Sequence, residues 1–311
     1  LVAAGHTLEL RPLPEGLIAR ASLFRTLRAA DAVILQRKLL PGLQLSLLRR
    51  CAKTLIFDYD DAVWLRDSYS WKGTTSRRRY RRFARSVRAA DLVLAGNDFL
   101  AAEAKRLAPH AAVDVIPTCI DPARYSLADH ARSERLHLVW IGSSSTLQGL
   151  ERIRPILDAV GQAVPGTRLK LICDRFVGFE HLTVEPLPWC AAHEARDLAS
   201  ADIGITWIPD DDWSRGKCGL KVLQYQAAGL PVIANPVGVH PSFVEPGRTG
   251  ILAHTPDDWI EGVRRLADPA LRNRMGTAAR AQLEEQYSVA AGAKRWLDAL
   301  ARLLEPRKRA A

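Results

Sequence analysis

One stretch of the sequence decides the fold, and it reads GKCGLKVLQYQAAGLPVI at residues 216–233. A glycine-rich turn opens a helical pattern, the pattern stops at Gly229, and an apolar run follows from Pro231. A turn, a helix and a strand in this order are typical of a parallel sheet, in which each helix crosses back to start the next strand. The segment therefore predicts an α/β fold.

The same alternation continues on both sides of this stretch. Residues 121–135 interrupt it, because they are polar and have no sustained period. We therefore predict two Rossmann-like, doubly wound domains, residues 1–126 and 127–288, and a C-terminal helix at 289–311 that packs back on the first domain. Two such domains facing each other would hold a ligand in the cleft between them. Expected strands are residues 6–10, 32–35, 53–57, 92–95, 113–116, 136–141, 169–173, 203–207 and 231–234, and expected helices are 16–29, 43–50, 76–89, 98–107, 147–164, 191–199, 220–228, 256–267, 269–287 and 289–304.

The composition narrows the class of protein. The 311 residues suffice for two domains of about 150 residues each. Hydrophobic residues make up 48% and charged residues 25%, which excludes a disordered chain, and no apolar run approaches the ~20 residues of a membrane-spanning helix. The five cysteines form no C-x-x-C pair, so neither a zinc site nor a disulfide framework is expected, and a reducing cytoplasm is the simplest location. The net charge of +10 favours anionic partners.

The start of the helix in the opening stretch is a candidate anion site. Gly219 and Leu220 begin this helix, and a helix N-terminus presents unpaired N–H groups and a partial positive charge. Lys217 and Lys221 flank it with full positive charges. These residues predict a phosphate or diphosphate ligand. A capped helix with solvated lysines is the alternative that they leave open.

Several segments together resemble glycosyltransferase family 4, a group of retaining enzymes with the GT-B fold. The pattern G-L-x-x-L-x-x-x-A-x-G-x-P-V at 219–232 is similar to the donor-site helix of that family, and VIPTCID at 115–121 is similar to the end of its first domain. LVWIG at 138–142, NPVG at 235–238 and E-x-G-x-x-G-I-L at 245–252 continue the resemblance over nearly the whole chain. The resemblance implies two Rossmann-like domains and transfer of a sugar from a nucleotide diphosphate donor to a hydroxyl acceptor with retention of configuration.

The resemblance also assigns candidate donor-binding residues. The family usually has two glutamates separated by seven residues, and this chain has Gly216 and Gln224 at those positions. An amide can still bond ribose hydroxyls, whereas Gly216 cannot replace a carboxylate; the acidic run at residues 210–212 is a candidate replacement. The residues expected at the donor are Gly142, Ser143, Ser144, Lys217, Gly219, Leu220, Lys221 and Gln224, and Lys217 is also a catalytic candidate.

An acidic turn at residues 58–61 ends an expected strand of the first domain and faces the expected cleft. Asp60 and Asp61 are candidate catalytic residues and Asp58 is an acceptor-side candidate, because carboxylates can orient a hydroxyl or accept its proton. Lys38 and Asn97 follow neighbouring strands and are acceptor-side candidates as well. Turn formation and helix capping are the alternative roles. GT-B enzymes generally need no bound metal, so the resemblance implies neither a metal nor a cofactor besides the donor substrate.

The helix expected at residues 76–89 is strongly basic. Tyr80, Phe83 and Val87 fall on one face, and the arginines between Arg77 and Arg88 fall largely on the other. Such a basic face suits an anionic membrane surface, or it is an ordinary solvated face. Nucleic acid is not expected as a partner, because no aromatic stacking platform accompanies the charge. The expected location is the cytoplasm, with association with the inner face of the membrane as an option.

The family resemblance leaves the substrate open. The expected acceptor is a sugar or a lipid-linked molecule, as in bacterial cell-surface polysaccharide or glycolipid synthesis. The first residues from Leu1 resemble the end of a helix, so a preceding strand and its glycine loop are expected to be missing. Two alternatives stay open: a non-hydrolysing sugar-nucleotide epimerase on the same scaffold, and an inactive relative that binds a nucleotide sugar.

Overall fold

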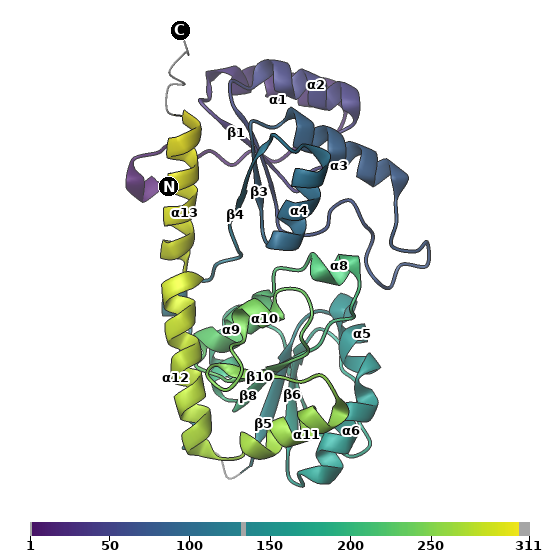
Figure 1. The fold of residues 1–311 in the computed structure, drawn as a ribbon, viewed down its shortest axis with the longest axis vertical. Coiled ribbons are helices and arrows are strands. Elements are labelled where there is room, and N and C mark those ends of the chain that lie inside the picture. Colours follow the sequence, from purple (N-terminus) through teal and green to yellow (C-terminus); the bar gives the residue numbers. More distant parts are fainter. Residues whose placement is uncertain (1, 132–134, 305–311) are drawn as a thin grey trace. The chain divides into compact units, whose positions relative to one another are not determined.

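The computed structural model describes residues 2–131 and 135–304, which form two compact units (Figure 1). Unit 1 contains the described residues up to Thr118, the segment Asp211–Cys218 and the described residues from Gly292 onward. Unit 2 contains the described residues of Cys119–Asp210 and the segment Gly219–Ala291. A short segment far along the sequence therefore completes the first unit. Among the described residues, no helix is long and apolar enough to cross a bilayer.

The described part of unit 1 is built on a parallel sheet with the strand order β1-β2-β3-β4. Each connection between neighbouring strands runs through a helix, so the carboxyl ends of all these strands lie at one edge of the sheet. The strands are β1 (Val33–Gln36), β2 (Leu55–Tyr59), β3 (Leu92–Ala95) and β4 (Ala112–Val115). The helices are α1 (Leu17–Thr26), α2 (Gly42–Cys51), α3 (Arg77–Ala89), α4 (Asp98–Leu107) and α8 (Asp212–Arg215), with 3-10 turns at Val2–Ala4 and Leu27–Ala29.

Both faces of this sheet are covered. On one face, the ring of Phe83 from α3 packs against Tyr59 of β2 and against Trp64, with ring centroids 5.2 and 4.4 Å apart. On the other face, Ile56 packs with Leu300 of α13 (Val289–Leu304), whose residues from Gly292 onward belong to unit 1. Because successive strand residues point to opposite faces, two covered faces explain why β2 and β3 are nearly continuous apolar runs.

Unit 2 contains a parallel sheet with the strand order β7-β6-β5-β8-β9-β10. The order reverses between β5 and β8, which is the 3-2-1-4-5-6 arrangement of the Rossmann fold, and ligands bind outside the carboxyl ends of the strands at such a reversal. The strands are β5 (His137–Ile141), β6 (Arg168–Cys173), β7 (Thr183–Pro188), β8 (Ile203–Thr206), β9 (Val232–Ala234) and β10 (Gly250–Leu252). The helices are α5 (Ser144–Arg152), α6 (Arg154–Ala163), α7 (Glu194–Ala199), α9 (Leu220–Ala227), α10 (His240–Phe243), α11 (Pro256–Arg265) and α12 (Pro269–Gln286), with a 3-10 turn at Pro122–Arg124.

One tyrosine fixes α9 against the strand reversal. The hydroxyl of Tyr225 accepts a hydrogen bond from the Ile141 N–H of β5 (3.1 Å) and donates one to the Ile205 carbonyl of β8 (3.0 Å). The ring lies so close to Gly204 that a Cβ atom there would stand 2.3 Å from it. Glycine at 204 therefore lets α9 pack directly on the two strands that flank the reversal.

Two sequence expectations are wrong, and two strands are not predicted at all. Residues 6–10 are exposed and irregular rather than a strand, because extended chain needs a partner strand and β1 pairs only with β2 among the described residues. The helix expected at 147–164 is two helices: Pro155 lacks an N–H group, so it cannot continue α5 and lies in the first turn of α6, which begins at Arg154. The sequence does not predict β7, whose two prolines weaken the strand pattern but are tolerated at a sheet edge, or the short β10.

Candidate functional site

The strand reversal in unit 2 is lined by the start of α5. Gly142 and Ser143 follow β5, and the helix begins at Ser144. A Cβ atom at Gly142 would stand 2.4 Å from the Trp140 ring and 2.8 Å from Thr146 Oγ1, so only glycine fits this turn. The Ser143 N–H donates to Thr146 Oγ1 (3.3 Å), which fixes the first turn of α5.

The start of α9 lies on the β8 side of the same reversal. Gly219 precedes the helix with a φ of +64°, the left-handed conformation that glycine adopts without strain. A side chain at this position would also stand 2.7 Å from both Val239 and Phe243. Within the described part of the chain, no side chain caps this start, so the first N–H groups from Leu220 onward can bind an anion.

Lys221 joins the two helix starts. Its Nζ lies 3.3 Å from Thr146 Oγ1 in the first turn of α5 and 4.0 Å from the centre of the Trp140 ring. Two helix N-termini and an ammonium group thus meet at the reversal, and each of them favours negative charge. The arrangement suits the phosphate or diphosphate that was expected near Gly219, Leu220 and Lys221.

Ser144 has a partner of its own. Its N–H and hydroxyl both bond the carboxylate of Asp174, at 2.6 and 2.8 Å. The hydrogen bond from the Ser144 hydroxyl, together with that from its N–H, lowers the pKa of Asp174. An anionic ligand at the start of α5 therefore has to displace Asp174 from Ser144, or bind beside it.

Gln224 lies in a cluster around Glu194, a residue that the sequence analysis missed. Glu194 Oε1 accepts hydrogen bonds from Gln224 Nε2 (2.8 Å) and the Tyr125 hydroxyl (2.7 Å), and Oε2 accepts one from Trp189 Nε1 (2.8 Å). Burial alone would raise the pKa of Glu194, but the hydrogen bonds from Tyr125, Trp189 and Gln224 hold it below its usual value. The available signal was a glutamate at the start of an expected helix, five residues after a tryptophan.

His240 is a buried neutral group next to this region. Its Nδ1 donates to the Asn235 carbonyl (2.8 Å), and burial lowers the pKa of His240 to about 4, with the charge of Lys221 acting in the same direction. The side chain is 2% exposed. His240 therefore supports the loop after β9 rather than offering a charge to a ligand.

In unit 1, the carboxyl ends of β1 and β2 carry a cluster of opposite charges. Arg37 follows β1 and forms ion pairs with Asp61 and with Asp60, where Nε lies 3.1 Å from Oδ1. Lys217 Nζ lies 3.1 Å from Asp61 Oδ1. Arg37 has a φ of +56°, a conformation that is rare outside glycine and that often marks a functional position. The predicted acceptor-side candidate Lys38, the next residue, is exposed, whereas Arg37 was not predicted from the sequence.

Asp58 differs from the other carboxylates of the turn. It lies within β2 and accepts a hydrogen bond from Gln36 Nε2 (3.0 Å). Burial raises the pKa of Asp58 to about 6, with the neighbouring charge of Asp60 acting in the same direction. A carboxylate with this pKa is ionised at neutral pH and is more basic than an ordinary aspartate.

Asn97 holds the segment 211–218 within unit 1. Its Nδ2 donates to the carbonyls of Lys217 (3.0 Å) and Arg215 (3.3 Å), and its Oδ1 accepts from the Leu100 N–H and so caps α4. The ammonium of Lys217 also lies 3.6 Å from the centre of the Trp213 ring. Asn97 and Trp213 thus position Lys217 beside Asp61.

Gly216 is required by the packing of this segment. A Cβ atom at this position would stand 2.7 Å from the Cβ of Ala62 and 3.0 Å from its backbone nitrogen. The neighbouring Asp211 caps α8 by accepting a hydrogen bond from the Ser214 N–H. Within residues 2–131 and 135–304, no three histidine, cysteine or acidic side chains gather as metal ligands.

Two parallel α/β units, of which one has the Rossmann strand order, define the GT-B fold class, and solved structures agree with the predicted fold. Sucrose-phosphate synthase from Thermosynechococcus elongatus superposes with a TM-score of 0.67 at 18% identity, covering 92% of this chain and 78% of that one. HepE from Anabaena, in complex with UDP and glucose, superposes with a TM-score of 0.68 at 15% identity, covering 92% and 82%.

Sequence comparisons point to the same class. Residues 152–298, a little less than half of the chain, match a family model described as glycosyl transferase-like. A D-inositol 3-phosphate glycosyltransferase from Actinosynnema mirum is 28% identical over 218 residues, which cover 61% of this chain and 52% of that protein. The chain therefore spans about half the length of this curated relative.

Proposed function

We propose that this protein is a glycosyltransferase that moves a sugar from a nucleotide diphosphate donor to a hydroxyl acceptor. The observation that carries the proposal is the meeting of two helix starts and Lys221 at the strand reversal of unit 2. The names of the relatives and the GT-B fold support it. Because the HepE structure contains UDP, uridine nucleotides are the first donors to test.

The donor half of the reaction is assigned to unit 2. Negative charge builds up on the diphosphate as its bond to the sugar breaks, and groups fixed beforehand stabilise that charge without reorganising. The N–H groups from Gly219 to Lys221 and the Lys221 ammonium are such groups. Gln224 and Glu194 offer an amide and a carboxylate to the ribose hydroxyls.

The acceptor half is assigned to unit 1. Asp58 is the proposed base, because its raised pKa suits proton transfer from a hydroxyl near neutral pH. Asp60 and Asp61 already form ion pairs with Arg37 and Lys217, an arrangement that suits orientation of an acceptor better than proton transfer. Lys217 is assigned to charge stabilisation on this side of the reaction.

The finer identity follows the family resemblance. We propose retention of configuration, as in family 4, and a sugar or lipid-linked acceptor of cell-surface polysaccharide or glycolipid synthesis. The Actinosynnema relative is named for an inositol phosphate substrate, so a phosphorylated polyol belongs in the acceptor panel. The proposed location is the cytoplasm.

The test incubates the full chain with nucleotide sugars, beginning with UDP-glucose, and measures released nucleotide, transferred sugar and epimerised donor. Lys221→Ala should weaken UDP binding about 10- to 100-fold, since a hydrogen bond to a charged group contributes about 1.5–3 kcal/mol. The matched control is Lys105→Ala, an exposed lysine of α4 in unit 1. Binding of UDP without turnover of any donor would refute the enzyme proposal and favour an inactive relative. Epimerised donor without sugar transfer would favour an epimerase.

We also propose that α3 of unit 1 attracts an anionic membrane. Its apolar face is buried in the unit through Phe83 and Val87, so the attraction is electrostatic, through exposed arginines such as Arg78 and Arg81. In sedimentation with phosphatidylserine vesicles, Arg78→Gln and Arg81→Gln together should weaken binding at least about 10-fold, at about 1 kcal/mol for each arginine. Equal sedimentation of parent and variant would refute this surface.

A further inference from the structure

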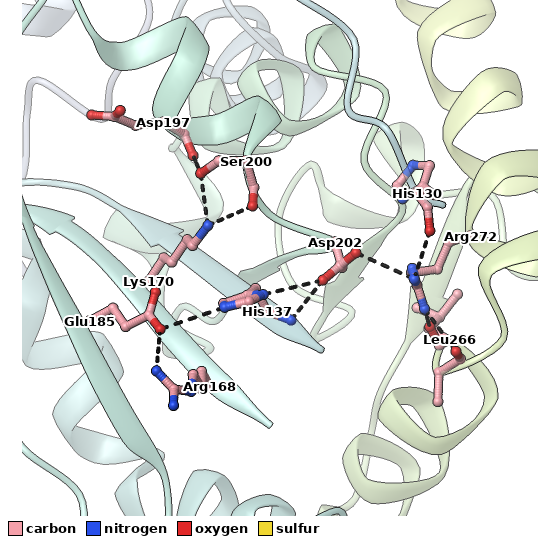
Figure 2. Close-up of polar contacts among 11 residues, drawn as sticks. His130, His137, Arg168, Lys170, Glu185, Asp197, Ser200, Asp202, Leu266 and Arg272 are labelled. Carbon is pink, nitrogen blue, oxygen red and sulfur yellow. Dashed lines mark hydrogen bonds and ion pairs between the residues drawn. The ribbon is translucent and has the colours of Figure 1, made fainter. Parts of the chain in front are cut away.

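The arginines of α3 differ in their partners from two arginines of unit 2. In unit 2, Arg168 Nη1 lies 2.8 Å from Glu185 Oε1 (Figure 2). Arg272 Nη2 likewise lies 3.4 Å from Asp202 Oδ1. In unit 1, α3 carries seven arginines, and none of them forms an ion pair with a carboxylate within the described residues. The positive charge of α3 is therefore available to an anionic partner.

The acidic residues around α3 do not cancel this charge. No aspartate or glutamate occurs within residues 68–90. In α4, which packs beside α3, Glu103 Oε1 already lies 2.8 Å from Arg106 Nη2. After α3, Asp91 Oδ2 lies 3.2 Å from Arg49 Nη2. The helix and the residues before it therefore stay strongly basic, which suits an extended anionic surface.

The loop before α3 exposes a tryptophan. Trp71 is 88% exposed, and the Lys72 ammonium lies 4.6 Å from the centre of its ring. Among the described residues 66–89, Trp71 is the one large apolar side chain that is exposed. A single exposed apolar side chain is ordinary by itself, so any role of Trp71 has to be argued from its loop and its neighbours.

Hydrogen bonds fix the backbone of this loop. The Arg66 N–H donates to the Thr74 carbonyl (2.7 Å). The Arg66 guanidinium donates to the carbonyls of Lys72 (3.3 Å) and Gly73 (3.2 Å). Gly73 has a φ of +68°, a left-handed conformation that glycine adopts without strain. These contacts hold the loop in a shape that keeps Trp71 in solvent.

We propose that Trp71 inserts into the headgroup layer of the anionic membrane that α3 attracts; this inference rests on the proposed attraction of α3. Tryptophan prefers this layer because its ring is apolar and its indole N–H can bond a polar group. Lys72 and the arginines of α3 then face lipid phosphates. A nucleic-acid strand stacks successive bases on several rings, whereas the described residues 66–89 expose one large apolar side chain. The combination of one interfacial side chain with a basic helix favours a lipid surface.

Sedimentation of the full chain with vesicles of phosphatidylcholine and phosphatidylserine measures the contribution of Trp71. Trp71→Ala should weaken binding about 10-fold, because alanine removes most of the apolar surface that leaves water on insertion. The ring is exposed, so this substitution should leave the fold intact. The control is Leu127→Ala in unit 2, where the leucine is 61% exposed. This control should change binding by less than about 2-fold.

Brominated lipids test the insertion itself, because bromine quenches the fluorescence of a tryptophan that enters the lipid. The chain has eight tryptophans, so the parent is compared with Trp71→Phe, which keeps an aromatic ring. The fluorescence of the parent should fall on binding to brominated vesicles, and most of this fall should be absent in Trp71→Phe. Quenching that persists in Trp71→Phe overturns the proposal. Equal sedimentation of the parent and Trp71→Ala, or an equal loss in Leu127→Ala, also overturns it.

The outcomes distinguish this inference from the attraction of α3. If Arg78→Gln and Arg81→Gln together weaken sedimentation while Trp71→Ala does not, α3 attracts the membrane and the insertion of Trp71 is refuted. If the parent binds no vesicles, both proposals are overturned. A single-stranded oligonucleotide is the last ligand to compare. Quenching of Trp71 by the oligonucleotide and not by brominated lipid would assign the surface to nucleic acid and overturn the proposal.

Discussion

Replacing Gly216 by alanine tests how the segment 211–218 packs in unit 1. Gly216 has φ −76° and ψ −3°, an ordinary right-handed conformation, so alanine meets no backbone strain there. The added Cβ would stand 2.7 Å from the Cβ of Ala62, whereas carbon atoms in contact prefer about 3.5–4.0 Å. Ala62 is 1% exposed and has little room to retreat. Overpacking of this kind costs about 1–3 kcal/mol.

The assay is differential scanning calorimetry of the full chain. For a unit of roughly this size, 1 kcal/mol corresponds to about 2–4 °C in Tm, so Gly216→Ala should lower the Tm of unit 1 by about 2–12 °C. The matched control is Gly178→Ala, because a Cβ atom at Gly178 meets nothing within 4 Å and the backbone there is not left-handed. That control should change stability by less than about 0.5 kcal/mol.

A second substitution tests whether the contact with Ala62 causes the loss of stability in Gly216→Ala. Ala62→Gly removes the atom that the new Cβ would strike, so the double variant should recover part of the loss, with a coupling of about 0.5–3 kcal/mol. If Gly216→Ala costs no more than Gly178→Ala, or if the two substitutions are additive, the close packing of Gly216 on Ala62 is refuted.

Three further predictions concern buried polar groups. The pKa of Asp58 is raised from 3.8 to about 6 in the fold, so the stability that its protonation contributes is fully present below about pH 4 and is lost as pH rises through 6. Asp58→Asn should therefore be more stable than the parent by about 1–3 kcal/mol at pH 8 and equally stable near pH 4. Guanidinium unfolding of both proteins at the two pH values measures this difference. Gln224→Glu should lower the Tm at pH 8, because it places a second carboxylate beside Glu194, and Glu194→Gln should restore it; an unchanged Tm would contradict the cluster. Arg272→Met should destabilise unit 2 by about 3–5 kcal/mol, because it leaves Asp202 charged and buried, and adding Asp202→Asn should recover most of the loss.

The elements of unit 1 that the sequence predicts best are those with local signals at both ends. Ser76 caps α3 and Asn97 caps α4, and each helix carries an apolar face of helical period, so the predicted bounds agree with the structure within a residue. The apolar run of β3 is predicted with its observed bounds because both of its faces are buried. In contrast, β7 forms through its pairing with β6, and its prolines disrupt the local strand pattern, so the sequence does not predict this strand.

The candidate site shows the same division. The turn at Gly219 and the adjacent Lys221 are visible in the sequence, because a glycine before a helix and a lysine in its first turn are local features. Contacts between distant residues are not visible: Gln224 reaches Glu194 across 30 positions, and Lys217 reaches Asp61 across 156. The ion pairs of Arg37 likewise join it to carboxylates that follow the next strand, and they are not visible in the sequence.

The two departures from the family resemblance have separate local causes. At Gly216, the neighbouring Ala62 leaves no room for any side chain. At Gln224, a carboxylate would face Glu194 Oε1, which now lies 2.8 Å from the Gln224 amide, and two carboxylates at such a distance cannot both ionise. The carboxylate of Glu194 therefore favours a hydrogen-bond donor at position 224. Tyr125 and Trp189 hold this carboxylate in place beside α9. With glutamine at 224, the carboxylate beside α9 comes from Glu194 and the amide comes from Gln224, so both kinds of polar group are still present. This supports the proposed nucleotide-binding function over loss of that function.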